Sequence, residues 1–162
     1  MKDTLLSPNF SLCELTRSEN RLYQKQNRAL AQKFILPLSV LANYLLEPAR
    51  FALACPLVVT CALRCPAQNE SIGGAKTSQH LLGQAADFIP RCCLGARAKV
   101  SLKEAYEVLR QNKFLHYGQL ILEEGWLHIS LGAPFRPLSK CAQSFEIKGG
   151  KKTSCENTEA KI

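Results

Sequence analysis

Two short segments of this chain carry the side chains best suited to metal chemistry. Residues 78–87 read SQHLLGQAAD, and residues 126–130 read WLHIS. Together they hold two of the three histidines, His80 and His128, and the carboxylate of Asp87. Zinc accepts two imidazoles and one carboxylate while keeping a fourth position open for water. Because the metal makes hydroxide available near neutral pH, an open zinc site of this kind is typical of hydrolytic chemistry.

Strand alternation predicts how these side chains meet. Residues 126–131 read as a strand whose aliphatic side chains face the core, so His128 faces a groove on the other side. Residues 85–89 read as a second strand, in which Asp87 points away from its large apolar neighbour. His80 precedes that strand, and the glycine after it permits a turn that folds the imidazole back toward the carboxylate. Spacing alone leaves an alternative, in which the histidines are half-buried hydrogen-bonded residues and the aspartate caps a turn.

The rest of the chain must supply a scaffold for these two segments. A serine followed three residues later by a glutamate predicts helix starts at Ser11 and Ser101. Apolar spacing predicts a core helix over residues 34–53 that ends or bends near Pro48, after a polar helix over 24–33. The other predicted elements are strands over 57–62, 85–89, 119–123 and 126–131, a loop over 64–77, a helix over 101–112, and a tight hairpin turn at 124–125. This order predicts an α+β fold with a small, mainly antiparallel sheet and helices packed on it.

The composition is that of one globular domain. The chain has 162 residues, 46% of them apolar and 21% charged. No run approaches the roughly 20 apolar residues that a membrane span needs. We therefore expect a single domain over residues 1–147 and a basic, flexible C-terminal tail over residues 148–162. The first residues lack the apolar core of a secretory signal, so we expect synthesis in a cytoplasm.

Charge and cysteine content narrow the classes of partner and site. The formal charge of +8 favours anionic partners, such as the acidic polymers of a cell envelope. The sequence has no arginine-rich helix, zinc-finger spacing or aromatic-studded basic strand, so we do not expect nucleic acid as a partner. Eight cysteines occur without a pair of CxxC motifs, which argues against a four-cysteine zinc site. We expect free, mostly buried thiols rather than a disulfide framework.

The two segments also resemble a known family. The patterns SxHxxGxAxD at 78–87 and WxHxS at 126–130 resemble the signature motifs of the zinc D-Ala-D-Ala carboxypeptidases, a family that includes phage peptidoglycan endopeptidases. Residues 9–18 look like the opening segment of its phage-associated branch, and residues 58–66 resemble the strand and Arg-Ser-Pro turn before the first motif. The resemblance covers about residues 9–132. It implies the α+β fold of the Hedgehog and DD-peptidase type.

The resemblance implies a role for each matching residue. His80, Asp87 and His128 would be the ligands of Zn²⁺. Arg64 would hold the carbonyl or carboxylate of the peptide substrate, since a guanidinium presents a planar fork of donors. Ser78 would contact a metal ligand or the substrate through its hydroxyl. Without the family, Arg64 reads as a surface arginine after a strand.

The general base is where the chain departs most from the family. A carboxylate three residues before the second histidine is usual, and Gly125 stands there. If strand geometry extends back into the turn, Glu124 shares the side of His128 and Glu123 points away. We therefore predict Glu124 as the catalytic base and Glu123 as the second candidate. A chain without a working base would keep its metal and lose most turnover, because general base catalysis contributes about 10²–10⁴-fold.

Three milder departures surround the same motifs. Gly118 stands where an aspartate is common, and Cys61 and Cys65 replace residues that are usually small and polar. The two cysteines flank Arg64, so their thiols could trap the metal or be oxidised. Plain packing of small side chains is the interpretation we favour.

The function implied by the resemblance is that of a zinc metallopeptidase acting on peptidoglycan stem peptides. Either D-Ala-D-Ala carboxypeptidase or endolysin-type endopeptidase activity is implied, in phage or prophage lysis or in cell-wall remodelling. We expect a monomer that reaches the wall after lysis, through a holin-like pore, or on a phage particle. The alternative function is a catalytically silent, zinc-stabilised module that binds wall peptide or another protein, because Gly125 occupies the usual base position.

Overall fold

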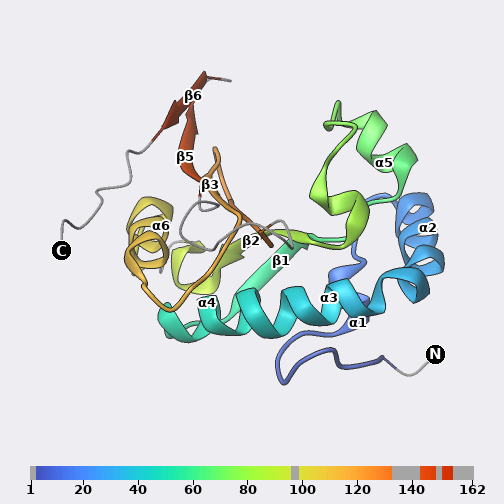
Figure 1. Ribbon diagram of the computed structural model, residues 1–162, viewed down its shortest axis with the longest axis horizontal. Helices are drawn as coiled ribbons and strands as arrows, with labels where there is room; N and C mark the ends of the chain where they lie inside the picture. Colours follow the sequence, from blue (N-terminus) through green and yellow to red (C-terminus); the bar gives the residue numbers. More distant parts are fainter. Residues whose placement is uncertain (1–2, 96–98, 133–142, 149–150, 155–162) are drawn as a thin grey trace.

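The computed structural model describes residues 3–95, 99–132, 143–148 and 151–154 (Figure 1). Its strands are β1 (Leu57–Cys61), β2 (Ala85–Pro90), β3 (Gln119–Leu122), β4 (Leu127–Ser130), β5 (Gln143–Lys148) and β6 (Lys151–Ser154). They form one sheet in the order β1-β2-β4-β3-β5-β6. The β3–β5 pair is parallel and the other pairs are antiparallel. Together with the helices, this sheet confirms the predicted α+β class.

Most of the helices lie where the sequence predicts them. They are α1 (Leu12–Leu15), α2 (Arg21–Ala31), η1 (Gln32–Phe34), α3 (Ile35–Leu41), η2 (Ala42–Leu46), α4 (Glu47–Ala52), α5 (Pro66–Ser71), η3 (Gln79–Leu82), η4 (Arg91–Cys93) and α6 (Leu102–Gln111). The predicted serine caps are present, since Ser11 accepts from the N–H of Glu14 and Ser101 forms a full capping box with Glu104. Helix α5 lies inside the segment that the sequence predicts as a loop. Its six residues are too few to show helical periodicity, so the sequence gives no sign of it.

The helical run from α2 to α4 extends unbroken from Arg21 to Ala52 and passes along one side of the sheet (Figure 1). The predicted bend is the π-helical turn η2, which ends directly before Glu47 and Pro48. Proline lacks the N–H for a bond four residues back and its ring crowds that carbonyl, so a wider turn accommodates it. The helix then continues to Ala52 rather than ending.

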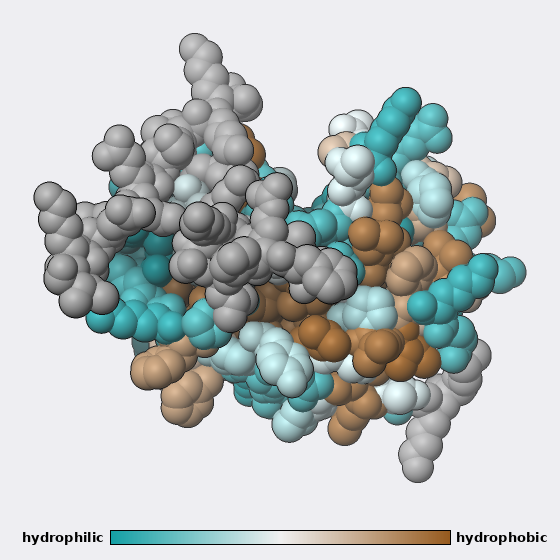
Figure 2. Space-filling view, viewed as in Figure 1, coloured by the Kyte–Doolittle hydropathy of each residue, from teal (hydrophilic) through white to brown (hydrophobic). Residues whose placement is uncertain are grey.

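The helical run from Arg21 to Ala52 is more apolar than we expect from the sequence. One 18-residue window has a mean hydropathy of 1.4, so the run is long and apolar enough to cross a membrane by length and composition. The core helix of a soluble protein passes the same test, and Leu38, Leu41 and Leu45 are fully buried here. Figure 2 shows that apolar residues also reach the surface of the molecule. Leu22 and Leu36 of this run are exposed.

The core fills the space between the helical run and one face of the sheet. Its fully buried side chains include Leu38, Leu41, Leu45, Leu46, Phe88, Tyr106, Leu109, Leu120, Leu127 and Ile129. In β2, Phe88 faces this core, so its neighbour Asp87 projects from the other face. In β4, Leu127 and Ile129 face the core and His128 projects with Asp87. The alternation predicted from the sequence is therefore present in both strands.

The sheet extends further toward the C-terminus than predicted. Strand β5 pairs with β3, and β6 pairs with β5 in the register Lys148↔Lys151. Residues 151–154, which we assigned to the tail, are therefore a strand, whereas residues 149–150 and 155–162 lie outside the described residues. The Gly-Gly dipeptide between these strands is a two-residue hairpin signal that the sequence analysis missed.

Gly118 marks a close crossing of backbones at the start of β3. A Cβ atom added there would lie 2.4 Å from the carbonyl oxygen of Leu131 and 2.8 Å from Cα of Gly132. The N–H of Gly118 also donates to the carbonyl of Ser130 at 2.7 Å. The crossing therefore has no room for the aspartate that the resemblance implies at this position.

We predict that Gly118→Ala destabilises the protein by roughly 1–3 kcal/mol, because the added methyl group meets backbone that must shift. Urea denaturation followed by circular dichroism measures this change. Lys113→Ala, at an exposed position nearby, is the control and should stay within about 0.5 kcal/mol of wild type. Equal stability of Gly118→Ala and the control would contradict the close crossing.

Candidate metal centre

Two nitrogen atoms and one oxygen atom converge at one end of the central strands. His128 Nδ1 lies 2.8 Å from Asp87 Oδ1. His80 Nε2 lies 3.3 Å from each of these atoms. Ligand atoms bound 2.0–2.1 Å from a tetrahedral zinc are about 3.3 Å apart. The spacing and the donor types of the three residues therefore fit a zinc ion. The distance from His128 Nδ1 to Asp87 Oδ1 is the shortest of the three, because these two atoms form a direct hydrogen bond.

Sheet register brings two of these side chains together. Asp87 in β2 and His128 in β4 are directly opposed residues of the antiparallel pair. Opposed residues project from the same face of the sheet, which places their side chains within contact distance. On the other side of β2, Cys61 is opposite Asp87, next to a register shift between Val59 and Cys61. Asp87 therefore lies between Cys61 and His128 in a row of residues that crosses β1, β2 and β4.

His80 reaches the same point from the helical turn η3. Its Nδ1 atom lies 2.7 Å from the carbonyl oxygen of Ala62. Because a carbonyl can only accept, Nδ1 carries the proton and Nε2 presents its lone pair to Asp87 and His128. Gly83 ends the turn with φ +64°, a conformation that favours glycine, and returns the chain into β2. The predicted glycine turn is therefore present.

Gln79 connects this turn to the other motif. Its Nε2 atom donates to the carbonyl oxygen of Leu131 at 2.7 Å, directly after β4. The N–H of Leu131 donates in return to the carbonyl of Gln84 at 2.9 Å. These two bonds fix η3 against the end of β4, and so fix His80 relative to His128. A glutamine next to a histidine carries no sequence signal for such a role, so this contact could not be predicted from the sequence.

Electrostatics keep both buried groups in the form that binds a metal. Burial favours the neutral acid at Asp87, but the hydrogen bond from His128 and the proximity of His80 outweigh it and hold the pKa of Asp87 well below its usual value. Burial lowers the pKa of His80 by more than the Asp87 carboxylate raises it. At neutral pH the site therefore presents a carboxylate and an uncharged His80 imidazole, as a metal ligand set requires.

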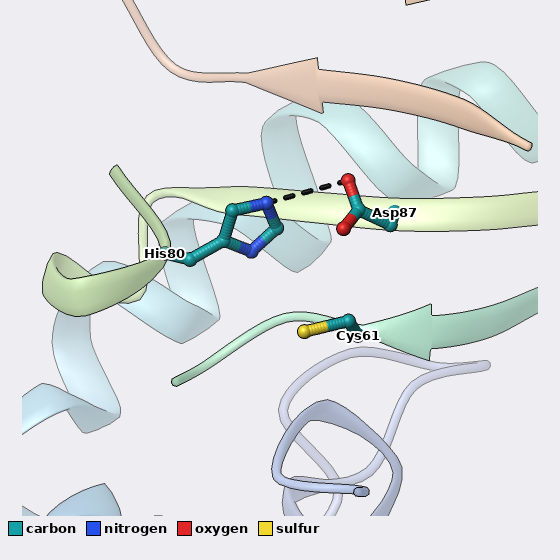
Figure 3. Close-up of side chains that lie close together, drawn as sticks. All are labelled: Cys61, His80 and Asp87. Carbon is teal, nitrogen blue, oxygen red and sulfur yellow. Dashed lines mark ion pairs between the residues drawn. The ribbon is translucent and has the colours of Figure 1, made fainter. Parts of the chain in front are cut away.

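Arg64 and Cys61 complete the immediate surroundings of Asp87. Arg64 Nη2 lies 2.5 Å from Asp87 Oδ2, and Arg64 Nε donates to Cys61 Sγ at 3.0 Å. The thiol of Cys61 and ligand atoms of His80 and Asp87 lie within 4.8 Å of one another, as Figure 3 illustrates. Burial raises the pKa of Cys61, so the sulfur is a neutral thiol at neutral pH. It is a further potential donor beside the three predicted ligands, which is the alternative to the plain packing that the sequence favours.

The side chains surround a groove of about 790 Å³ on the face of the sheet away from the core. Its lining residues are Arg64, Ile72, Gly74, Ala75, Thr77, Ser78, Gln79, His80, Asp87, Gln119, Ile121, Glu123, Trp126 and His128. Among them are all three predicted metal ligands and both predicted substrate-contacting residues, Arg64 and Ser78. Trp126, which is 38% exposed, supplies an aromatic wall beside His128. The structure thus gathers residues from four separate segments around one open cavity.

The two candidate bases are placed differently from the prediction. Glu123 lines the groove, whereas Glu124 is exposed and is not among the lining residues. Strand β4 begins only at Leu127, so its alternation does not extend back to Glu124. Glu123 instead follows the alternation of β3, on the side of Gln119 and Ile121. The expectation that Glu123 points away from the site is therefore incorrect.

The surroundings of Glu123 are those of a carboxylate near the candidate metal site. Desolvation raises the pKa of Glu123 above its ordinary value. The negative charge of Asp87 raises it further, while His128 lowers it. Its N–H donates to the carbonyl of Trp126 at 3.0 Å, so residues 123 and 126 flank the predicted turn at 124–125. Glu123 is therefore the better placed of the two candidates.

Comparison with known proteins agrees with this geometry. A search of curated proteins finds no match. A family model described as Peptidase M15 matches residues 8–130. The matched range covers most of the chain and contains every residue of the metal centre and both candidate bases. The predicted family is confirmed: the chain belongs to the peptidase M15 family.

Proposed function

We propose that this protein is a zinc-dependent peptidase that hydrolyses the stem peptides of peptidoglycan. The observation that carries the proposal is the triangle of His80, Asp87 and His128 ligand atoms, with edges of 2.8–3.3 Å, at the floor of an open groove. Membership of the peptidase M15 family supports a metallopeptidase and indicates peptidoglycan as the substrate. The net charge of +8 suits an anionic wall polymer.

His80, Asp87 and His128 would hold the zinc ion. Bound zinc would polarise the scissile carbonyl and lower the pKa of water. The chain supplies the orientation of these ligands: Ala62 fixes the His80 tautomer, and Arg64 holds the second oxygen of Asp87. Because Oδ2 is held by the guanidinium, Oδ1 is the oxygen presented to His80 and His128.

Glu123 is the residue we assign as general base, in place of Glu124. It lines the groove, and its raised pKa brings it closer to the pH at which a carboxylate exchanges protons efficiently. It would take a proton from the attacking water and return it to the leaving amine. Arg64 keeps further guanidinium N–H groups besides those that contact Asp87 and Cys61, and these would orient the peptide carbonyl.

Delivery to the wall is a separate part of the proposal. We infer that the enzyme acts in phage or prophage lysis or in wall remodelling, and that it meets the wall after lysis, through a holin-like pore, or on a phage particle. The opening segment that looks like the phage-associated branch supports this inference. Carboxypeptidase and endopeptidase activity use the same groups, so product analysis decides between them.

Metal removal is the first test. The purified chain should release new amino groups or D-alanine from peptidoglycan, and a chelator should abolish that release. Adding one equivalent of Zn²⁺ should restore it, because the three ligands remain in place. Product release is measured by amine labelling and mass spectrometry of the digest.

Two results would overturn the proposal. Hydrolysis that persists after complete chelation would show that the reaction does not need a metal ion. Zinc binding without any product would favour the alternative of a silent, zinc-stabilised module that binds wall peptide or another protein.

A further inference from the structure

Two cysteines meet at the end of the β1–β2 ladder that is remote from the metal centre. The Sγ atoms of Cys55 and Cys92 are 2.8 Å apart. The N–H of Cys92 also donates to Cys55 Sγ at 3.4 Å. Both residues are partly exposed, so a soluble oxidant can reach them. We propose that Cys55 and Cys92 are a disulfide site, which is reduced in a reducing compartment and becomes bonded in an oxidising one.

The end of the β1–β2 ladder brings the segments that carry Cys55 and Cys92 together. Leu57 is opposite Pro90 in the antiparallel ladder, and the N–H of Arg91 donates to the carbonyl of Pro56 at 2.7 Å. This backbone bond ties the two segments together directly beside the cysteines, where the chain enters η4. The two Sγ atoms are 2.8 Å apart and would approach to about 2 Å in a disulfide. The bond therefore needs a small movement of the side chains and no separation of the two segments.

The neighbouring Cys93 is the natural competitor, and its position disfavours it. It follows Cys92 directly in η4 and packs against the hydrophobic core. The contacts to Cys55 Sγ come from the thiol and the N–H of Cys92. A metal site formed by these thiols is also disfavoured. Within the described parts of the chain, the group with metal-ligand spacing is that of Cys61, His80 and Asp87.

The reaction is an exchange with a low-molecular-weight disulfide such as oxidised glutathione. One cysteine loses its proton, its thiolate attacks a glutathione sulfur, and one glutathione thiolate leaves. The second cysteine then loses its proton and attacks the mixed disulfide, which releases the other glutathione. The protein pair is oxidised by two electrons, and the two released thiolates take up the two protons. Burial and the neighbouring thiols raise the pKa of Cys92 to about 12, so oxidation should accelerate as pH rises.

The bond would close a loop that contains most of the metal centre. Arg64, His80 and Asp87 all lie between Cys55 and Cys92 in the sequence. Closing a loop of this length restricts the unfolded chain and is expected to raise the melting temperature by roughly 8–15 °C. The bond would therefore stabilise the site-bearing segment under oxidising conditions, such as those outside a cytoplasm. This inference does not depend on the proposed peptidase activity.

The test is oxidation of the full chain with oxidised glutathione, followed by alkylation, digestion and mass spectrometry. Wild type should lose two alkylatable thiols and gain a link between tryptic peptides 51–64 and 92–97. Its melting temperature should rise, and dithiothreitol should reverse both changes. Cys55→Ser and Cys92→Ser should lose the link and the temperature shift. Cys93→Ser is the matched control and should keep both, with Cys92 then the single cysteine of its peptide.

The outcomes separate clearly. Two thiols that stay alkylatable in excess oxidised glutathione would overturn the proposal, as would a link that survives in Cys55→Ser. A link that disappears in Cys93→Ser would assign the bond to the other cysteine of the pair and would equally overturn it. Folding of each serine variant is checked by circular dichroism in reducing buffer, where all should match wild type.

Discussion

Replacing Asp87 by alanine is expected to abolish zinc binding and to destabilise the protein by about 3–5 kcal/mol. Asp87 accepts from Arg64 and His128 and lies 3.3 Å from His80 Nε2, so its loss leaves a nearly buried guanidinium and the His128 imidazole without their shared partner. The side chain of Arg64 is 13% exposed, which makes its uncompensated charge costly. Urea denaturation measures the stability, and elemental analysis measures the zinc content.

The pH dependence of stability gives an independent check on Asp87. Because the folded state lowers the pKa of Asp87, the stabilisation is present above the unfolded pKa of about 4 and is lost as pH falls toward the folded value. Metal-free wild type should therefore lose stability steeply below about pH 4, and Asp87→Ala should lose less. Parallel pH profiles for the two proteins would contradict the assigned hydrogen-bond network. Asp87→Asn, which keeps the side-chain volume, separates the loss of charge from the loss of packing.

Replacing Glu123 by glutamine is expected to lower kcat/KM by about 10²–10⁴-fold while leaving the zinc content unchanged. Glu123 lines the groove and its carboxylate is electrostatically coupled to Asp87 and His128, but it is outside the ligand triangle. Glu124→Gln is the matched control, one residue along the same turn, and should change kcat/KM by less than about threefold. Initial rates of amine release from peptidoglycan measure both variants.

The acid limb of the pH profile tests the same assignment. A general base must be ionised, so activity is present above its pKa and lost as pH falls through it. Because desolvation raises the pKa of Glu123, the acid limb of wild type should lie above the ordinary carboxylate value. A larger loss in Glu124→Gln than in Glu123→Gln would reverse the assignment and restore the prediction made from the sequence.

The shared face of Asp87 and His128 could be predicted from the sequence because strand alternation is a local property. Asp87 and His128 lie in short strands whose buried apolar neighbours define the core face. The helix starts at Ser11 and Ser101 were equally predictable, since capping depends on residues three positions apart. These features need no knowledge of distant contacts.

The features that were missed depend on where strands end and on which segments meet. The choice between Glu123 and Glu124 depended on where the two strands end, and β4 begins at Leu127 rather than at residue 126. The contact of Cys55 with Cys92 depends on a register that only pairing of β1 with β2 defines. Strands β5 and β6 carry weak apolar patterns. They join the sheet because β5 pairs with β3 and β6 pairs with β5. Long-range pairing of this kind overrides local propensity.

Titration of Zn²⁺ into the metal-free chain, compared with His128→Ala, tests the central claim most directly. Calorimetry should show one zinc per wild-type chain, because His80, Asp87 and His128 form a single ligand set. Loss of groups that merely orient metal ligands weakens affinity 10–100-fold, so removal of a ligand should weaken it by at least about 100-fold. Wild type that takes up no zinc, or His128→Ala that binds zinc as tightly as wild type, would contradict the account.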